Sequence, residues 1–306
     1  MIAIEYTAYG NSDVIHLKQV DKPQPKENQI LIKVAATTVN PMDMKIRSGV
    51  MEKQIPLTFP FIPGLDVAGI IEEVGANVSR LKKGDQVFAT TLGGTYAEYI
   101  ALNEDQAALI PKNTNTTEAA ALAIPLVTAY TFLVESGQLK TGQKILIQGA
   151  AGAVGGIMVQ MAKTLGAYVI GTASGKGIEL AKSLGADEVI DYKTQDFTEL
   201  VKDVDLVVDL AGGDTQIKSF KVIKQGGLLL SGVMPPSEEL AKQYHVTAKF
   251  ISSTPSYHKL EFGKKLVEEG KIKTQIAETM KLKDAAHAQD LVTLGGINGK
   301  IVLEID

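Results

Sequence analysis

The first third of the chain alternates short hydrophobic runs with Gly, Pro and Asn. The runs are IAIEYTAYG, VIHLKQV, QILIKVAATTV, GLDVAGIIEEVG, DQVFATT and TYAEYIAL, all before about Asn115. Short runs rich in Ile, Val, Thr and Tyr that are bounded by turn-forming residues are typical of β-strands. We therefore predict a β-rich domain over residues 1–120.

A helical pattern follows these strand-like runs. Residues 116–136 read TTEAAALAIPLVTAYTFLVES, which has helix-forming composition and an N-cap candidate at its start. Because Pro125 interrupts the run, we expect two helices here, which join the halves of the chain.

From Lys144 onward, runs of strand length alternate with runs of helix length. The strand-like runs are KILIQG, AYVIGTA, DEVIDY, DLVVDLA and GLLLSGV, and the helical runs between them include VGGIMVQMAKTLG, KGIELAKSLG and DTQIKSFKVIK. This alternation predicts right-handed βαβ units in one parallel, doubly wound sheet. We predict a Rossmann-type domain over residues 121–270.

The last residues, 271–306, return to a strand, helix, strand order in TQIAETMKL, KDAAHAQDLVTLG and GKIVLEI. We assign this tail to the N-terminal β-rich domain, so that the Rossmann-type domain is an insertion. The predicted fold class is α/β with two domains, which agrees with a length of 306 residues, more than one hydrophobic core normally serves.

Charge and composition narrow the function classes. The formal net charge is −4 and the pI about 5.7, so no basic excess favours a nucleic-acid partner. Cysteine is absent, which excludes disulfides, thiolate nucleophiles and cysteine-ligated metal centres and favours a cytoplasmic location. The sequence shows no secretory signal at its start and no apolar run of about 18 residues, so we expect no membrane partner.

A glycine-rich turn connects the first strand of the predicted Rossmann-type domain to a helix. A dinucleotide pyrophosphate needs a tight turn free of side chains, exposed backbone N–H groups and a helix N-terminus, and KILIQGAAGAVGG followed by a helical run provides all three. Gly152 and Gly155 match the second and third positions of G-x-G-x-x-G, and Ala150 stands at the first. The candidate cofactor-binding residues are Gly149, Ala151, Gly152, Ala153 and Val154. The alternative is a turn in which glycine serves packing only.

The end of the second strand, GTASGKG, indicates which dinucleotide is bound. An NAD-binding domain places Asp or Glu there on the ribose 2′-hydroxyl, whereas this chain has Thr172, Ala173 and Ser174. Ser174 can donate a hydrogen bond to a 2′-phosphate and Lys176 offers a charge, so NADPH is favoured by about tenfold to a thousandfold. Strict exclusion of NADH does not follow. The alternative is that both residues are a solvated helix start.

Several segments in one order carry a family resemblance. They are VNPMDMKIRSG at 39–49, PGLDVAGIIEEVG at 63–75, KKGDQVFA at 82–89, GTYAEYI at 94–100, and GAAGAVG followed by LGADEVIDY, and the C-terminal GKIVLEI fits as well. The chain resembles the medium-chain dehydrogenase/reductase superfamily, specifically its zinc-free quinone-oxidoreductase branch, over nearly its whole length. The resemblance implies a GroES-like catalytic domain completed by the tail, an inserted NADPH-binding domain and a homodimer.

The chain departs from the zinc-bearing members of that superfamily. Those enzymes have a Cys in the region of Asn40 to Asp43, a Gly-His-Glu at the position of Gly64–Asp66 and a four-cysteine lobe that this sequence lacks. None of the four histidines has a ligand-like spacing, namely His16, His245, His258 and His287. We therefore expect no metal site.

The resemblance also implies roles for particular residues. Asn40 would lie beside the nicotinamide and substrate, with Asp43 and Lys45 near the mouth of the cleft; Asn40 could instead be a turn residue before Pro41. The Thr128 hydroxyl would meet the nicotinamide side, unless it bonds its own helix backbone. The remaining implied cofactor contacts are Tyr192 by the 2′-phosphate, Ala211, Gly212, Ser231 and Val233 by the nicotinamide ribose and carboxamide, and Asn298 to Lys300 from the tail.

These residues predict an NADPH-dependent oxidoreductase that transfers hydride to a quinone or another α,β-unsaturated carbonyl. Such an acceptor is already electrophilic, so the protein mainly has to orient it. We expect one hydrogen bond to the developing enolate oxygen, from Asn40 or, as a distant second candidate, Tyr257. Two alternatives stay open: an NADPH-binding protein with little turnover, and a reductase of alkenals or enones rather than quinones. GLLLSGV and AKFISSTPS could pair across the twofold axis of a homodimer.

Overall fold

The computed structural model describes residues 1–305, which form two compact units. Unit 1 comprises Met1–Ile124, Pro255–Glu268 and the residues from Ile276 onward, and unit 2 comprises Pro125–Thr254 and Glu269–Gln275. Residues 255–268 depart from the domain ranges expected from the sequence, 1–120, 121–270 and 271–306. Their helix α8 (Tyr257–Glu268) packs on strand β7 (Ala107–Leu109) and so belongs to unit 1.

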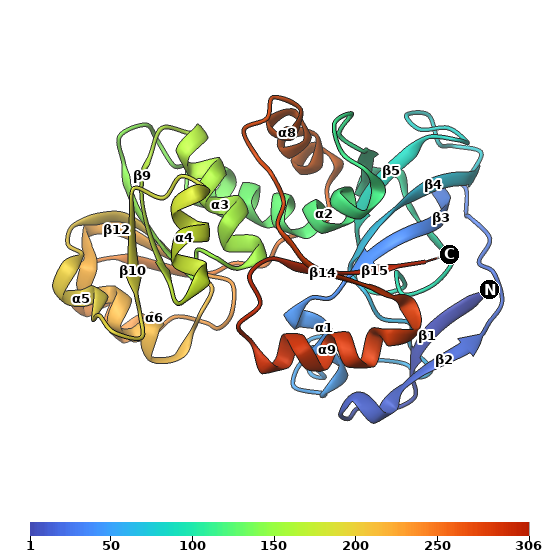
Figure 1. The fold of residues 1–306 in the computed structure, drawn as a ribbon, viewed down its shortest axis with the longest axis horizontal. Coiled ribbons are helices and arrows are strands. Elements are labelled where there is room, and N and C mark those ends of the chain that lie inside the picture. Colours follow the sequence, from blue (N-terminus) through green and yellow to red (C-terminus); the bar gives the residue numbers. More distant parts are fainter. Residues whose placement is uncertain (306) are drawn as a thin grey trace. The chain divides into compact units, whose positions relative to one another are not determined.

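Unit 1 is built on a seven-stranded, mostly antiparallel sheet with the order β14-β15-β3-β4-β5-β7, in which β6 also pairs with β3 (Figure 1). A two-stranded ribbon, β1 and β2, accompanies this sheet. The bounds of the strands are β1 (Ile2–Tyr6), β2 (Ile15–Gln19), β3 (Gln29–Thr38), β4 (Asp66–Val74), β5 (Gln86–Thr90), β6 (Tyr99–Asn103), β14 (Ile276–Lys281) and β15 (Lys300–Glu304). Two further helices belong to this unit, α1 (Pro41–Arg47) and α9 (Ala285–Leu294).

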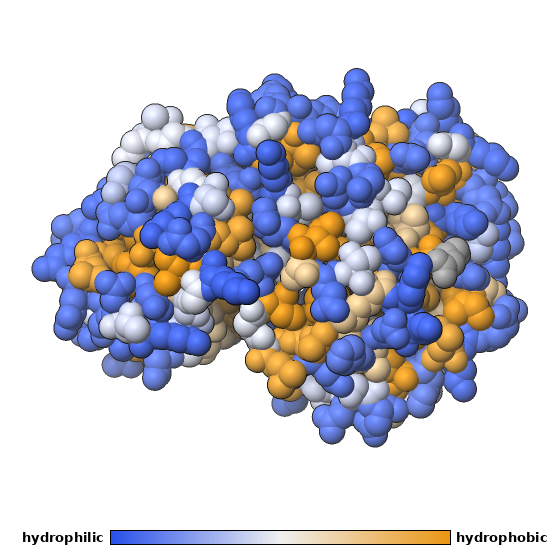
Figure 2. Space-filling view, in the orientation of Figure 1, coloured by the Kyte–Doolittle hydropathy of each residue, from blue (hydrophilic) through white to orange (hydrophobic). Residues whose placement is uncertain are grey.

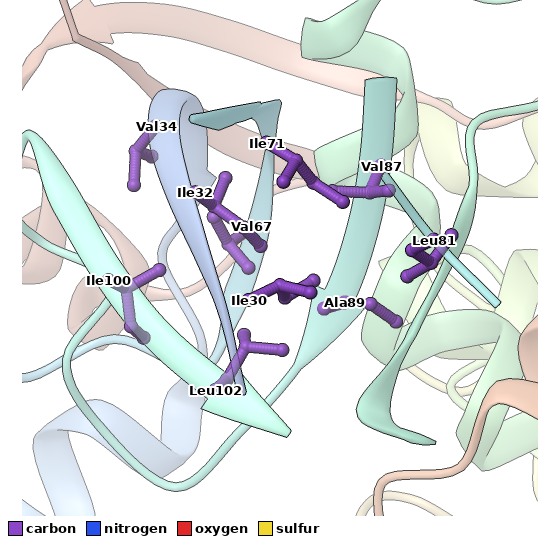
Figure 3. Close-up of a cluster of buried hydrophobic side chains, with 11 residues drawn as sticks. Ile30, Ile32, Val34, Val67, Ile71, Leu81, Val87, Ala89, Ile100 and Leu102 are labelled. Carbon is purple, nitrogen blue, oxygen red and sulfur yellow. The ribbon is translucent and has the colours of Figure 1, made fainter. Parts of the chain in front are cut away.

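The core of unit 1 follows from the alternation of side chains along these strands. Ile30, Ile32 and Val34 occupy alternate positions of β3 and are buried together with side chains of β4, β5 and β6 (Figure 3). Successive residues of a strand point to opposite faces, so one apolar face of β3 suffices to fill this interior.

The C-terminal tail completes unit 1. Strand β15 lies between β14 and β3, with Val302 opposite Thr38. Ile301 and Leu303 pack in a buried cluster with Ile4 and Val39 from the start of the chain. The predicted return of the tail to the N-terminal domain is thereby confirmed.

Unit 2 is a six-stranded parallel sheet with the order β10-β9-β8-β11-β12-β13. Its strands are β8 (Lys144–Gln148), β9 (Tyr168–Ala173), β10 (Glu188–Asp191), β11 (Val204–Asp209), β12 (Ile223–Ser231) and β13 (Thr247–Phe250). The helices are α3 (Ala153–Thr164), α4 (Lys176–Ser183), α5 (Phe197–Leu200), α6 (Gly213–Ser219) and α7 (Glu238–Gln243). The order reverses between β8 and β11, as in a doubly wound Rossmann fold, where a dinucleotide binds at the carboxyl ends of the strands. The fold prediction is confirmed.

The strand order corrects one part of the dimer hypothesis. Strand β12, which contains GLLLS, pairs with β11 on one side and β13 on the other, so both of its edges are used within the chain. Among the described residues only β13 and β10 end this sheet. Pairing across a twofold axis could therefore use β13 and not GLLLSGV.

The segment over residues 116–136 is one continuous helix and not the two that we expected. Helix α2 (Thr116–Tyr130) contains Pro125 and continues directly into a π-helical segment, Thr131–Ser136. The backbone N–H of Ile124 donates to the Asp66 carboxylate at 2.6 Å, so a buried acceptor stabilises the helix where the proline disturbs its ladder.

This helix is also long and apolar enough to cross a membrane by length and composition alone. However, 67% of its most apolar stretch is buried inside the structure, which is the pattern of a core helix. Figure 2 shows hydrophobic residues in separate groups on a mostly hydrophilic visible face.

Candidate functional site

The turn after β8 forms an anion-binding cradle in unit 2. The Gly149 N–H donates to the Thr172 hydroxyl at 3.1 Å, and the Ala150 N–H donates to the Thr172 carbonyl at 3.0 Å, which fixes the turn on β9. Helix α3 begins directly after it, with Gly152 as an N-cap that carries no side-chain acceptor. The first N–H groups of α3, including those of Ala153 and Val154, therefore lack intrahelical partners and can bind an anion.

Two glycines of this turn have different reasons to be glycine. A Cβ on Gly155 would lie 2.1 Å from the Gly149 carbonyl oxygen, so the close packing of helix against turn requires glycine there. A Cβ on Gly152 would meet only that same oxygen at 3.4 Å, an ordinary contact, and its φ of −72° suits any residue. Packing within the chain does not explain Gly152, whose lack of a side chain leaves the backbone of this turn open to a ligand.

The ends of β9 and β10 bring two predicted residues together. The Ser174 hydroxyl donates to the Tyr192 hydroxyl at 2.9 Å. Lys176 is the first residue of α4, is exposed and has no ion-pair partner among the described residues. No carboxylate ends β9, so this corner presents two hydroxyls and a free ammonium group to an anionic ligand.

Asp209 organises the turns after β11 and β12. It is fully buried at the end of β11, and its Oδ1 accepts the N–H groups of Ala211 at 3.0 Å and Gly212 at 2.8 Å. Its Oδ2 accepts the Ser231 hydroxyl at 2.8 Å and the Gln216 amide at 3.0 Å. The Ser231 side chain is thus used inside the protein. The N–H groups of Ala211, Gly212 and Val233 are used inside the protein as well, so these turns present backbone carbonyl oxygens to a ligand.

Thr128 lies on α2 and is half-buried. The described residues offer its hydroxyl no hydrogen bond, in contrast to Thr131, whose hydroxyl donates to the Val127 carbonyl at 2.8 Å. The backbone-bonded alternative for Thr128 therefore does not describe this structure, and its hydroxyl is available to a ligand.

A buried polar cluster in unit 1 joins Asn40 to residues far along the chain. The Asn40 amide nitrogen donates to Asp66 Oδ2 at 2.9 Å and to the Thr38 carbonyl at 3.3 Å, and its Oδ1 accepts the Lys300 ammonium at 2.5 Å. Lys300 also donates to Asp66 Oδ2 and to Thr38 Oγ1, each at 2.9 Å. Asn40 and Lys300 are each 4% exposed and Asp66 is fully buried, so the ion pair is held in the protein interior.

Asp43 anchors the start of α1 beside this cluster. Its Oδ2 accepts the Asn40 backbone N–H at 2.8 Å and the Tyr96 hydroxyl at 3.1 Å. Burial raises the pKa of Asp43 to about 7 from an ordinary 3.8, and the Asn40 N–H and the Lys300 charge only partly oppose this. Burial likewise raises the pKa of Tyr96 well above its usual range, and the Asp43 charge raises it further.

The other predicted residues of unit 1 lie apart from these hydrogen bonds. Lys45 is half-buried on α1, and its side chain makes no hydrogen bond or ion pair to the described residues; Asn298 is half-buried in the loop before β15. Tyr257 begins α8, and the Arg80 guanidinium lies 4.0 Å above its ring. The structure therefore gives Tyr257 a packing partner and adds nothing to its candidacy as an oxyanion donor.

The sequence matches two protein families. Residues 26–112 match the alcohol dehydrogenase GroES-like domain, and residues 184–303 match the zinc-binding dehydrogenases. The chloroplast envelope quinone oxidoreductase homolog of Arabidopsis thaliana is 36% identical over 325 residues, which covers 99% of this chain and 98% of that protein. This chain belongs to the quinone-oxidoreductase branch of the medium-chain dehydrogenase/reductase family. It is thereby an oxidoreductase of that family.

Further members of the family extend the comparison. The 2-methylene-furan-3-one reductase of Solanum lycopersicum is 41% identical over 250 residues, which is 77% of this chain but only 63% of the tomato protein. The solved quinone oxidoreductase of Coxiella burnetii has a TM-score of 0.93 and 32% identity and covers 100% of this chain and 99% of that chain. The Escherichia coli quinone oxidoreductase complexed with NADPH has a TM-score of 0.91 and 28% identity, with both chains covered completely.

The zinc implied by the name of one matched family has no fitting donors in this member. The described residues contain no group of three His, Cys, Asp or Glu side chains placed to hold a metal ion. Asn40 and Asp66 lie where the sequence departs from the zinc-bearing relatives, and both contact the buried ammonium group of Lys300. A single carboxylate already paired with a cation does not make a zinc site.

Two functional residues escaped the sequence analysis. Asp66 was noted only as a departure from the zinc ligands, and its partners are 26 and 234 residues away. Asp209 did have a local signal, because an aspartate that ends a buried apolar strand lies at the carboxyl edge of a parallel sheet.

Proposed function

We propose that this protein is an NADPH-dependent reductase that transfers hydride to a quinone or another α,β-unsaturated carbonyl. The observation that carries the proposal is the corner of unit 2 formed by Ser174, Lys176 and Tyr192 beside a cradle whose Gly152 has no packing role. The NADPH complex of the Escherichia coli relative supports the same cofactor.

The residues of unit 2 would hold each part of the dinucleotide. The N–H groups of Ala151, Ala153 and Val154 would bind the pyrophosphate, and Ser174, Lys176 and Tyr192 the 2′-phosphate. The turns held by Asp209 would receive the nicotinamide ribose and carboxamide through backbone carbonyl groups, because Asp209 already accepts the Ala211 and Gly212 N–H groups. When bound, the cofactor supplies the hydride.

The acceptor class follows from what the side chains can and cannot do. No donor set for a Lewis-acid metal was found among the described residues, which favours an acceptor whose carbon is already conjugated to a carbonyl. The relatives named quinone oxidoreductase and 2-methylene-furan-3-one reductase are the two classes to compare. Asn40 remains our candidate for a residue that touches the reacting groups, and Thr128 and Asn298 for further cofactor contacts.

The test is NADPH oxidation by chelator-treated protein with a quinone and then an enone, repeated with NADH. We expect turnover that survives the chelator and falls about tenfold or more with NADH. In S174D the new carboxylate should repel a 2′-phosphate and bring the two cofactors to similar rates. T194V, an exposed change beyond Tyr192, is the control. Tight NADPH binding without turnover on either acceptor would replace the proposal with a binding function, and activity only after added zinc would refute it.

A homodimer and a cytoplasmic location stay predictions. The unpaired edge of β13 offers a surface for strand pairing between two copies. Light scattering on a size-exclusion column would test the dimer. Residues 245 and 251 bond to β12, so the N–H of Phe250 faces the open edge, and F250P should reduce the dimer to monomers if the strand is the contact.

A further inference from the structure

We propose that Lys300 is a positioning residue, with Asp66 as its counter-ion, that fixes the Asn40 side chain as a hydrogen-bond acceptor toward the reacting groups. This inference rests on the proposed function for its catalytic meaning. It changes two expectations from the sequence, in which Lys300 contacts the cofactor and Asn40 donates to an enolate oxygen.

A count of donors decides the role of Lys300. Its ammonium group has three protons, and the structure gives it three buried acceptors, on Thr38, Asn40 and Asp66, at 2.9, 2.5 and 2.9 Å. No proton is left for a cofactor phosphate or hydroxyl. Its charge is compensated by Asp66, which is itself fully buried.

The same count applies to the Asn40 amide. Its two N–H protons have acceptors in Asp66 Oδ2 and the Thr38 carbonyl, and one lone pair of Oδ1 accepts from Lys300. The unused capacity is the second lone pair of Oδ1. Asn40 can therefore accept a hydrogen bond from an N–H or O–H group of cofactor or substrate, and it has no free proton to give.

Opposite charges at the two ends of the amide determine its orientation. The Lys300 cation requires an oxygen at one end, and the Asp66 anion requires the NH2 group at the other. Rotation of the amide by half a turn would place its NH2 group against the Lys300 cation and its oxygen against the Asp66 anion. Two charge-assisted bonds favour the observed orientation by a factor of at least about a hundred.

The variant that tests this is D66N together with K300M, which removes both charges and so leaves no unpaired ion in the interior. The matched control is K281M with E304Q, which removes an exposed ion pair between the adjacent strands β14 and β15. We expect kcat to fall at least about tenfold in D66N/K300M while the Kd for NADPH stays within about twofold of wild type. The control should match wild type in both.

Two outcomes would overturn the proposal. A raised Kd for NADPH with kcat preserved would show that Lys300 binds the cofactor directly. Unchanged kcat and Kd in a folded D66N/K300M would show that the orientation of Asn40 has no consequence.

A readout that needs no turnover separates this proposal from the proposed function. In wild-type protein labelled with ¹⁵N-asparagine, the side-chain amide protons of Asn40, assigned with N40S, should exchange with solvent far more slowly than those of the exposed Asn77. Rapid exchange would refute the positioning role even in an active enzyme. Slow exchange in a protein without turnover would leave the cluster intact and reject only the proposed reaction.

Discussion

The buried Asp43 predicts an unusual pH dependence of stability. Its pKa is raised by burial to about 7, against 3.8 when the group is fully solvated. The folded protein therefore keeps a proton that the unfolded chain releases between these two values. The retained proton raises the free energy of unfolding. This increase is complete below about pH 4 and is lost as the pH rises toward 7.

The size of the effect follows from the same two values. Their difference of about three pH units, at about 1.36 kcal/mol for each, corresponds to about 4 kcal/mol, most of which is lost between pH 4 and 8. D43N removes the titrating group, and its side-chain oxygen can still accept the Asn40 N–H. Relative to D43N, wild-type protein should lose about 3 kcal/mol of unfolding free energy between pH 5 and pH 8.

Urea unfolding of both proteins, followed by circular dichroism at several pH values, measures this difference. Carboxylates with lowered pKa values, such as Asp187 and Asp205, are common to both proteins and cancel. If the wild-type and D43N profiles run parallel from pH 5 to 8, Asp43 titrates as an ordinary carboxyl group and the reasoning fails.

Four further substitutions probe the two units. G155A should destabilise unit 2 by about 3 kcal/mol, because its Cβ meets a backbone oxygen. G152A should leave the melting temperature unchanged or raised and weaken NADPH binding about tenfold. Thermal unfolding measures the first effect and titration calorimetry the second. D209N should lower the free energy of unfolding by about 2–3 kcal/mol and weaken NADPH binding, since an NH2 group then faces the Gln216 or Ser231 donors. Unchanged binding would mean that the turns keep their conformation without Asp209. K300M alone should lower the free energy of unfolding by about 3–5 kcal/mol, because it leaves Asp66 unpaired. D66N/K300M should lower it clearly less. Equal losses of the two variants in urea unfolding would argue against a charge effect.

Local patterns were sufficient for the fold and for the phosphate cradle. The hydrophobic period changes from that of strands to alternating strands and helices near Lys144, and the parallel sheet of unit 2 follows from that alternation. The helix over 116–136 was misjudged because Pro125 normally breaks a helix, and the acceptor that accommodates it, Asp66, lies 58 residues from Ile124. The same limit applies to Asn40. Its neighbours in sequence do not show how its amide is used, since the carboxylate that accepts an amide proton comes 26 residues later and the cation on the amide oxygen 260 residues later.

The position of β15 has a consequence for the order in which the chain folds during synthesis. Strand β15 fills the sheet of unit 1 between β14 and β3, and Lys300 at its start neutralises Asp66. Until β15 leaves the ribosome, unit 1 has an open edge on β3 and the Asp66 carboxylate lacks its cation. Unit 2 has all six strands by Phe250 and can fold earlier. Unit 1, which begins the chain, is thus completed only after unit 2. Residues 1–124 expressed alone should therefore not yield a folded fragment.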